Sequence, residues 1–170
     1  MPDRCQVSSG IAMRILILLL LICSSLAAGA SLKPSDEQFL IIQTNAEYVF
    51  EDSFAQAYNK LAELNDTIAG QPIYHLIYSS ILHAQMVDAE SDDQEKLLLE
   101  NLDMSIENLK KWVDRNPGDA WGLFFLGSAY GYKSIWYGQN GNWLKSLFAG
   151  LKSKSRFSEA LEADSTLYDV

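Results

Sequence analysis

Hydrophobic residues recur three or four positions apart along most of the chain, which is the spacing of one helix face, and runs that alternate as in a strand are scarce. The pattern predicts an all-α protein of about six helices joined by short turns, so that neighbours in sequence lie antiparallel. The expected helices begin near Ser35, Phe54, Pro72, Ser91, Ala120 and Asn142, and end near Phe50, Leu64, Met86, Val113, Tyr137 and Ala163.

Polar residues at the ends of these stripes support the boundaries. Ser35 with Gln38, and Ser91 with Gln94, have the spacing of a capping box, in which a serine oxygen and a glutamine side chain satisfy two free amides at a helix start. Residues 116–118 read Asn-Pro-Gly and residues 138–141 read Gly-Gln-Asn-Gly, both typical of turns.

The first 30 residues have the composition of an export signal. Arg14 precedes nine consecutive apolar residues, 15–23, and small residues end the segment at Ala28-Gly29-Ala30. A charged start, a short apolar run and a small-x-small end predict a secretory signal peptide over residues 1–30, with Met13 a plausible true start. The apolar run is shorter than the roughly 20 residues that span a bilayer, so we expect no stable membrane span after cleavage.

Cys23 offers an alternative, because bacterial lipoproteins are acylated on a cysteine behind such a run. Ile22 occupies the position where those sites have a small residue, which favours cleavage after Ala30 over a lipid anchor. We therefore expect an exported protein of the periplasm or cell surface. Removal of residues 1–30 also removes both cysteines and leaves about 140 residues with a charge near −10.

Charge and composition exclude several classes of function. A pI of about 4.6 argues against a nucleic-acid partner, since phosphate binding requires a basic surface. The mature segment lacks cysteine, and His75 and His83 lie about 12 Å apart along one predicted helix, too far to share one zinc. We find no catalytic constellation, no metal site and no cofactor motif, so we expect a protein that is not an enzyme.

The acidic charge is unevenly distributed. Residues 31–119 hold 17 acidic and 6 basic residues, whereas residues 120–158 hold no acid, five basic residues and many aromatics. Such a segment can present a site for a protein, a small anionic ligand or a membrane surface. The candidate binding residues are Tyr130, Lys133, Trp136, Tyr137, Lys145 and Lys152, and the functional hypothesis expects Trp136 and Tyr137 to be exposed beside the lysines. The alternative is that Trp121, Phe125 and Tyr132 are core and that the bases form a solvated helix face.

Leu126-Gly127 and Tyr130, on a helix that begins three residues after Pro117, resemble the signature of tetratricopeptide repeats. Phe157, Ala160 and Leu161 resemble the end of the matching second helix. The resemblance covers about residues 36–165 and implies three helix pairs in a tetratricopeptide-like α-solenoid. It also implies a binding scaffold in which the first helices of the pairs form the concave face, and close helix approach at Gly127.

The repeat pattern is irregular. Three standard units of about 34 residues would fill about 102 positions, fewer than the segment contains, so an unrelated antiparallel bundle is the alternative. Because no polar capping helix follows the third pair, we expect a chain truncated at its carboxyl end, or an end that packs on a partner.

Two functional hypotheses follow. The first is an exported, non-catalytic scaffold that binds a protein or peptide. The second is a helical accessory component of a solute uptake system, which binds a small ligand through residues 120–158. A closed cavity lined by Trp121, Tyr130 and Trp136 would favour the second hypothesis, and an open groove would favour the first.

Overall fold

The computed structural model describes residues 30–65 and 70–169 of the chain. The chain divides after Ala30, and the fold below is that of the unit from Ser31 onward. The predicted signal peptide and the lipid-attachment site at Cys23 lie outside the described residues. None of the helices within the described ranges combines the length and the apolar character that crossing a membrane requires.

The described part is all-helical, as the hydrophobic spacing predicted. Its elements are α2 (Asp36–Phe50), α3 (Phe54–Asn65), α4 (Gly70–Asp88), α5 (Glu95–Arg115), α6 (Ala120–Gln139), α7 (Trp143–Ala163) and the short 3-10 helix η1 (Ser165–Asp169). Helix α5 begins at Glu95 rather than near Ser91 as predicted. The other helices start and end within about two residues of the predicted limits.

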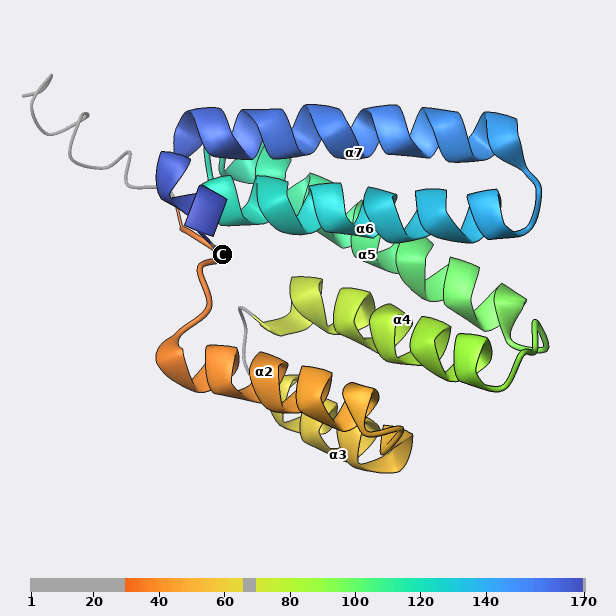
Figure 1. Cartoon of the computed structure of the whole chain (residues 1–170). Coiled ribbons are helices and arrows are strands. Elements are labelled where there is room, and N and C mark those ends of the chain that lie inside the picture. Colours follow the sequence, from red (N-terminus) through yellow and green to blue (C-terminus); the bar gives the residue numbers. More distant parts are fainter. Residues whose placement is uncertain (1–29, 66–69, 170) are drawn as a thin grey trace, which may run out of the picture. The chain divides into compact units, whose positions relative to one another are not determined.

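The six α-helices form three antiparallel pairs, α2 with α3, α4 with α5, and α6 with α7 (Figure 1). The second helix of each of the first two pairs packs on the first helix of the next pair, since α3 contacts α4 and α5 contacts α6. The first helices also touch one another, α2 with α4 and α4 with α6. This is an array of helix hairpins whose first helices share one face.

One of the two predicted capping boxes is present. Ser35 Oγ accepts from the Gln38 amide at 3.3 Å, and Gln38 Oε1 accepts from the Ser35 amide at 2.9 Å. The prediction at Ser91 is wrong: its hydroxyl accepts from the Asp93 amide at 3.2 Å, and α5 starts at Glu95. The reason is that the Ser91 amide is already bonded to the Met86 carbonyl at 3.0 Å, which closes the end of α4 through a left-handed Glu90.

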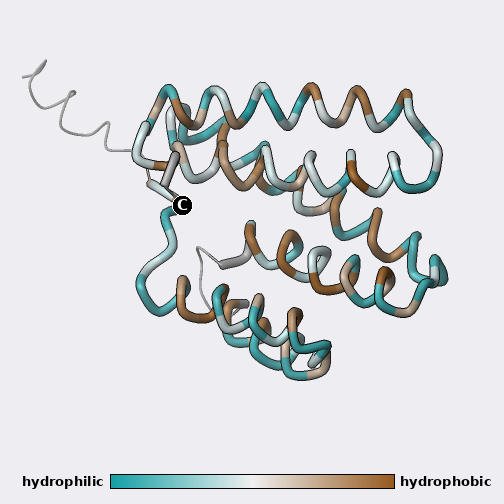
Figure 2. The backbone as a smooth tube through the Cα atoms, in the orientation of Figure 1, coloured by the Kyte–Doolittle hydropathy of each residue, from teal (hydrophilic) through white to brown (hydrophobic). Residues whose placement is uncertain are grey.

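The core consists of two clusters. The larger runs through all three pairs and includes Leu61, Ile81, Leu109 and Leu126, each at most 1% exposed. The smaller joins α4, α5 and α6 around Leu82, Leu102 and Trp136. Figure 2 shows hydrophobic positions recurring along α4 and α5. Between α3 and α4, Tyr58 donates to Gln85 Oε1 at 3.2 Å, and burial, with the nearby Tyr78, raises the pKa of Tyr58 to about 12.

The last pair is held by small residues at very short range. A Cβ on Gly127 would lie 2.9 Å from the Phe157 ring, which confirms the close helix approach expected at this glycine. Ser153 Oγ donates to the Gly127 carbonyl at 2.8 Å. Ser134 and Ser146 exchange hydroxyl-to-carbonyl bonds of 2.9 Å in each direction. Glycines and serines therefore let the two helices approach closely, and Phe157 of α7 packs on Phe124 of α6 beside them.

Candidate functional site

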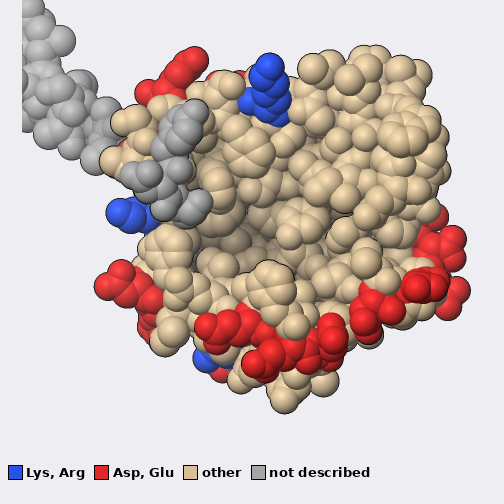
Figure 3. All heavy atoms as spheres, viewed as in Figure 1, with Lys and Arg blue, Asp and Glu red and all other residues tan. Residues whose placement is uncertain are grey.

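An apolar groove of about 390 Å³ lies on the face shared by the first helices of the three pairs. Its lining comes from α2, α4 and α6: Ile42, Asn45, Ala46, Val49, Phe50, Leu76, Ile77, Ser80, Ile81, His83, Ala84, Phe124, Phe125, Ser128 and Tyr132. Figure 3 shows the hollow open to solvent in the middle of this face. None of the lining residues belongs to α3, α5 or α7, the second helices of the pairs.

The sequence pattern of α2 is explained by this groove. Ile42, Ala46, Val49 and Phe50 all line it, whereas Phe39, at the start of the same helix, packs against the core. Ile41 of the same helix is 5% exposed in the core, and Asn45 is 2% exposed where the groove meets the core. Phe50 is 88% exposed at the end of the helix, so its ring stands in solvent beside the groove.

Few polar groups in the lining are free to bind an occupant. Ser80 Oγ donates to the Ile77 carbonyl at 2.8 Å, and Ser128 Oγ donates to the Phe124 carbonyl at 3.0 Å, so both hydroxyls are engaged by their own helices. His83 Nε2 lies 3.0 Å from Gln139 Oε1, and the imidazole contacts the Tyr132 ring edge-on. The groove is therefore built to receive apolar side chains.

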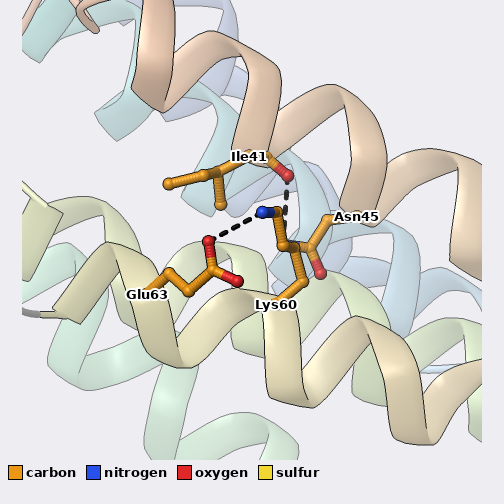
Figure 4. A network of polar contacts seen from close by, with 4 residues as sticks. All are labelled: Ile41, Asn45, Lys60 and Glu63. Atoms are coloured by element: carbon orange, nitrogen blue, oxygen red, sulfur yellow. Dashed lines mark hydrogen bonds and ion pairs between the residues drawn. The ribbon is translucent and has the colours of Figure 1, made fainter.

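Asn45 is the exception among the polar groups of the lining. Its Nδ2 donates to the Ile41 carbonyl at 3.2 Å, and its buried Oδ1 has no hydrogen-bond partner in the described part of the chain. Figure 4 shows this side chain directed from α2 toward α3, where Lys60 pairs with Glu63 at 2.7 Å. The unpaired oxygen is thus turned toward the α2–α3 packing, and the groove itself stays apolar.

The aromatic and basic residues predicted as a site lie elsewhere. Tyr130, Lys133 and Tyr137 are three or four positions apart, on a side of α6 turned away from the groove-lining Phe124, Ser128 and Tyr132. Lys145 and Lys133 lie over the Tyr137 ring, 5.4 and 5.9 Å from its centroid, and Lys152 lies 5.4 Å over Tyr130. The structure thus brings five of the six predicted residues together in two adjacent clusters.

Two of those residues are less available than the sequence suggested. Trp136 is 4% exposed, which contradicts its expected exposure: its ring packs with Leu82 and Leu102, and its Nε1 donates to Glu95 Oε1 at 3.1 Å. Helical spacing turns Trp136 toward α4 and α5 although its neighbour Tyr137 is half-buried. Lys133 forms an ion pair with Asp103 of α5. By contrast, Trp121 and Phe125 are buried, as the core alternative expected, whereas its third residue, Tyr132, is half-buried and lines the groove.

The pocket imagined for a small ligand is not assembled from the expected residues. Trp121 and Trp136 pack in different core clusters, and neither they nor Tyr130 line the groove. His75 Nδ1 contacts Asn101 Oδ1 at 2.9 Å, and Ser79 bonds to the main-chain carbonyl of His75 rather than to its ring. Within residues 30–65 and 70–169, no cluster of His, Cys, Asp or Glu has the arrangement of a metal site.

Charge is distributed unevenly around the groove. In Figure 3, acidic side chains gather along the α2 edge of this face and at the turn between α4 and α5. That turn carries four acidic residues whose side chains are all exposed to solvent: Asp88, Glu90, Asp92 and Asp93. An occupant with positive charges at its ends would meet this acidic margin favourably.

Comparison with models of known families, with curated proteins and with solved structures finds no match for the chain. A proposal for the function therefore rests on the geometry of the groove and the chemistry of its margin.

Proposed function

We propose that the chain is an exported, non-catalytic scaffold of tetratricopeptide-like helix pairs that binds a protein or peptide segment in the groove of α2, α4 and α6. The observation that carries this proposal is the origin of the lining: all of it comes from the first helices of the three pairs. This is the face on which the family resemblance placed the binding surface.

The chemistry of the groove favours one kind of occupant. Its lining is dominated by Ile, Leu, Val, Ala and Phe side chains, and the serine hydroxyls in it are already bonded to the main chain. Apolar side chains entering the groove would lose water without leaving polar groups unpaired. The acidic margin supports Lys or Arg residues flanking these apolar side chains.

The export part of the proposal depends on residues 1–30, whose charged start, apolar run and small-residue end are those of a secretory signal. A periplasmic or cell-surface scaffold needs no disulfide if its helix pairs share a continuous core. The larger hydrophobic cluster, which extends from Ile41 in α2 to Ala160 in α7, is consistent with that requirement.

Filling the groove tests the proposal. Peptides are selected on the wild-type protein from a phage-displayed random library, and their affinities are then measured for Ala46→Trp and Ala84→Trp. Both alanines line the groove and neither is fully buried, so an indole at either position would occupy the groove without entering the core. We expect each variant to bind the selected peptides at least about tenfold more weakly, equivalent to about 1.4 kcal/mol.

Ala55→Trp is the matched control, because Ala55 is exposed on α3 and lies outside the groove. It should leave peptide affinity unchanged, and circular dichroism should show that all three variants keep their helical content. Selected peptides that bind the groove variants as tightly as the control would contradict the proposal.

A further inference from the structure

The outward face of α7 carries an uncovered row of large apolar side chains. Five of them fall within nine residues: Trp143 is 73% exposed, Leu144 65%, Leu147 58%, Phe148 57% and Leu151 55%. Leu144, Leu147, Phe148 and Leu151 have the i, i+3, i+4, i+7 spacing of a single helix face. Isolated exposed apolar residues are ordinary, but a contiguous row of this kind marks a surface that meets another apolar phase.

The inward face of α7 does not need these residues. It buries Ala149, Ser153 and Ala160, and it approaches α6 through glycines and serines. A Cβ on Gly150 would lie 3.1 Å from Ser134 Oγ, so larger side chains do not fit between the helices there. The usual orientation of an amphipathic helix is therefore reversed in residues 143–151, with small residues toward the protein and large apolar ones toward solvent.

Cationic side chains flank the apolar row. Lys145 and Lys152 lie on one flank, over the rings of Tyr137 and Tyr130, and Lys154 lies near the other flank by helical spacing. No described carboxylate forms an ion pair with any of these three, whereas Lys133 and Arg156 pair with Asp103 and Glu159. The acids of α7 begin at Glu159, about 12 Å along the axis beyond Leu151.

We propose that residues 143–154 of α7 dock on an anionic lipid surface, with the apolar row at the level of the headgroups and the lysines beside it. Leu, Phe and Trp on one face with Lys on its flanks are the composition of helices that lie in a membrane interface. The net negative charge of the chain does not oppose this mode, because residues 143–154 hold no acid and Asp103 of α5, which reaches the Tyr137 cluster, is neutralised by its ion pair with Lys133. At physiological ionic strength, charges more than about 8 Å from the lipid are largely screened.

Vesicle binding tests the proposal, using protein isolated from cells that express the whole gene. We expect binding to vesicles of phosphatidylcholine with phosphatidylglycerol, weaker binding at high salt, and little binding to phosphatidylcholine alone. The fluorescence of Trp143 should shift to the blue on binding, and Trp143→Phe should remove that shift. Lys145→Gln and Lys152→Gln should each lower the partition coefficient about fivefold, the effect of one lysine near an anionic surface.

A pair of matched variants tests whether the apolar row of α7 is the surface that binds the vesicles. Leu147→Glu should weaken vesicle binding at least about tenfold. Leu40→Glu, which changes a leucine of similar exposure (60%) on α2, should have no effect. Equal binding by these two variants, or equal binding to neutral and anionic vesicles, would overturn the proposal. So would a concentration-dependent dimer that Leu147→Glu dissociates in a protein that does not bind vesicles, since a second copy would then cover the face.

Discussion

Asp119 joins the start of the folded unit to the turn between α5 and α6. Its Oδ1 accepts from Ser31 Oγ at 2.7 Å, and its Oδ2 accepts from the Leu32 amide at 2.9 Å and from Trp112 Nε1 at 2.7 Å. Leu32 is fully buried as a result. Hydrogen bonds to a charged acceptor contribute more to stability than neutral ones, so one carboxylate holds two distant segments together.

We expect Asp119→Ala to lower the free energy of unfolding by about 2–4 kcal/mol, because it removes three hydrogen bonds and leaves the Trp112 indole and the Leu32 amide without their acceptor. Urea denaturation measures the change. Asp114→Ala is the control: Asp114 is exposed on α5, and its removal should cost less than about 0.5 kcal/mol. Equal stability of the two variants would show that the Asp119 bonds contribute nothing.

Residue roles of this kind are largely invisible in the sequence. Asp119 bonds to residues 87 and 88 positions away, and no local pattern indicates such partners. Trp136 was misjudged for a related reason: aromatic and basic neighbours suggested an exposed site, but the rotation of α6 between α4, α5 and α7 decides which ring is buried. Gly127 was predicted correctly because a glycine beside a predicted helix partner has one common physical reason, the close approach of two helices.

At the scale of helices, local signals determined the boundaries and tertiary packing determined the faces. The caps and turns placed most helix ends. The Ser91 capping box failed, because the end of α4 had already used the serine amide, and Asn142 stands at the start of α7 without a side-chain cap bond. The stripe along α2 was recognisable as an apolar face, but its periodicity could not tell whether it faced the core, a groove or solvent, and the apolar row of α7 was not singled out beside its basic residues. The groove and the outward row of α7 were therefore accessible only from the structure.

The α6–α7 interface gives a test at this scale. Gly127→Ala would place a Cβ 2.9 Å from the Phe157 ring, which packs against Phe124 and cannot move freely. We expect a net loss of about 1–2 kcal/mol, since overpacking outweighs the gain in helix propensity from glycine to alanine. Thermal unfolding followed by circular dichroism measures it.

Gly131→Ala is the matched control on the same helix. Its Cβ would lie 3.3 Å from Ser153 Oγ, which must shift by a few tenths of an ångström while it stays bonded to the Gly127 carbonyl. Because the gain in helix propensity offsets part of this cost, stability should fall clearly less than in Gly127→Ala. A Gly127→Ala variant as stable as Gly131→Ala would contradict the interpretation of this interface as a close approach that requires glycine.

At the scale of the whole unit, three helix pairs turn their first helices to one face and leave a groove there. The number of helices, their pairing and the uneven charge could be predicted from the sequence. The opposite placement of two surfaces could not: the groove lies on one side of α6, and the cationic clusters at Tyr130 and Tyr137 lie on another. Five of the six candidate binding residues thus belong to the α7 side, Trp136 is buried toward α4 and α5, and the groove is lined mainly by aliphatic residues that no sequence motif singled out.

The most direct test of the groove is a chemical-shift titration of the labelled protein with a peptide selected on it. The proposed function predicts that the largest amide shifts fall on groove residues of all three first helices, such as Ala46, Ala84 and Ser128, with little change on α3 and α5. Shifts concentrated instead around Tyr130, Tyr137 and Lys152, with the groove amides unmoved, would contradict it and assign binding to the aromatic and basic side of the last helix pair.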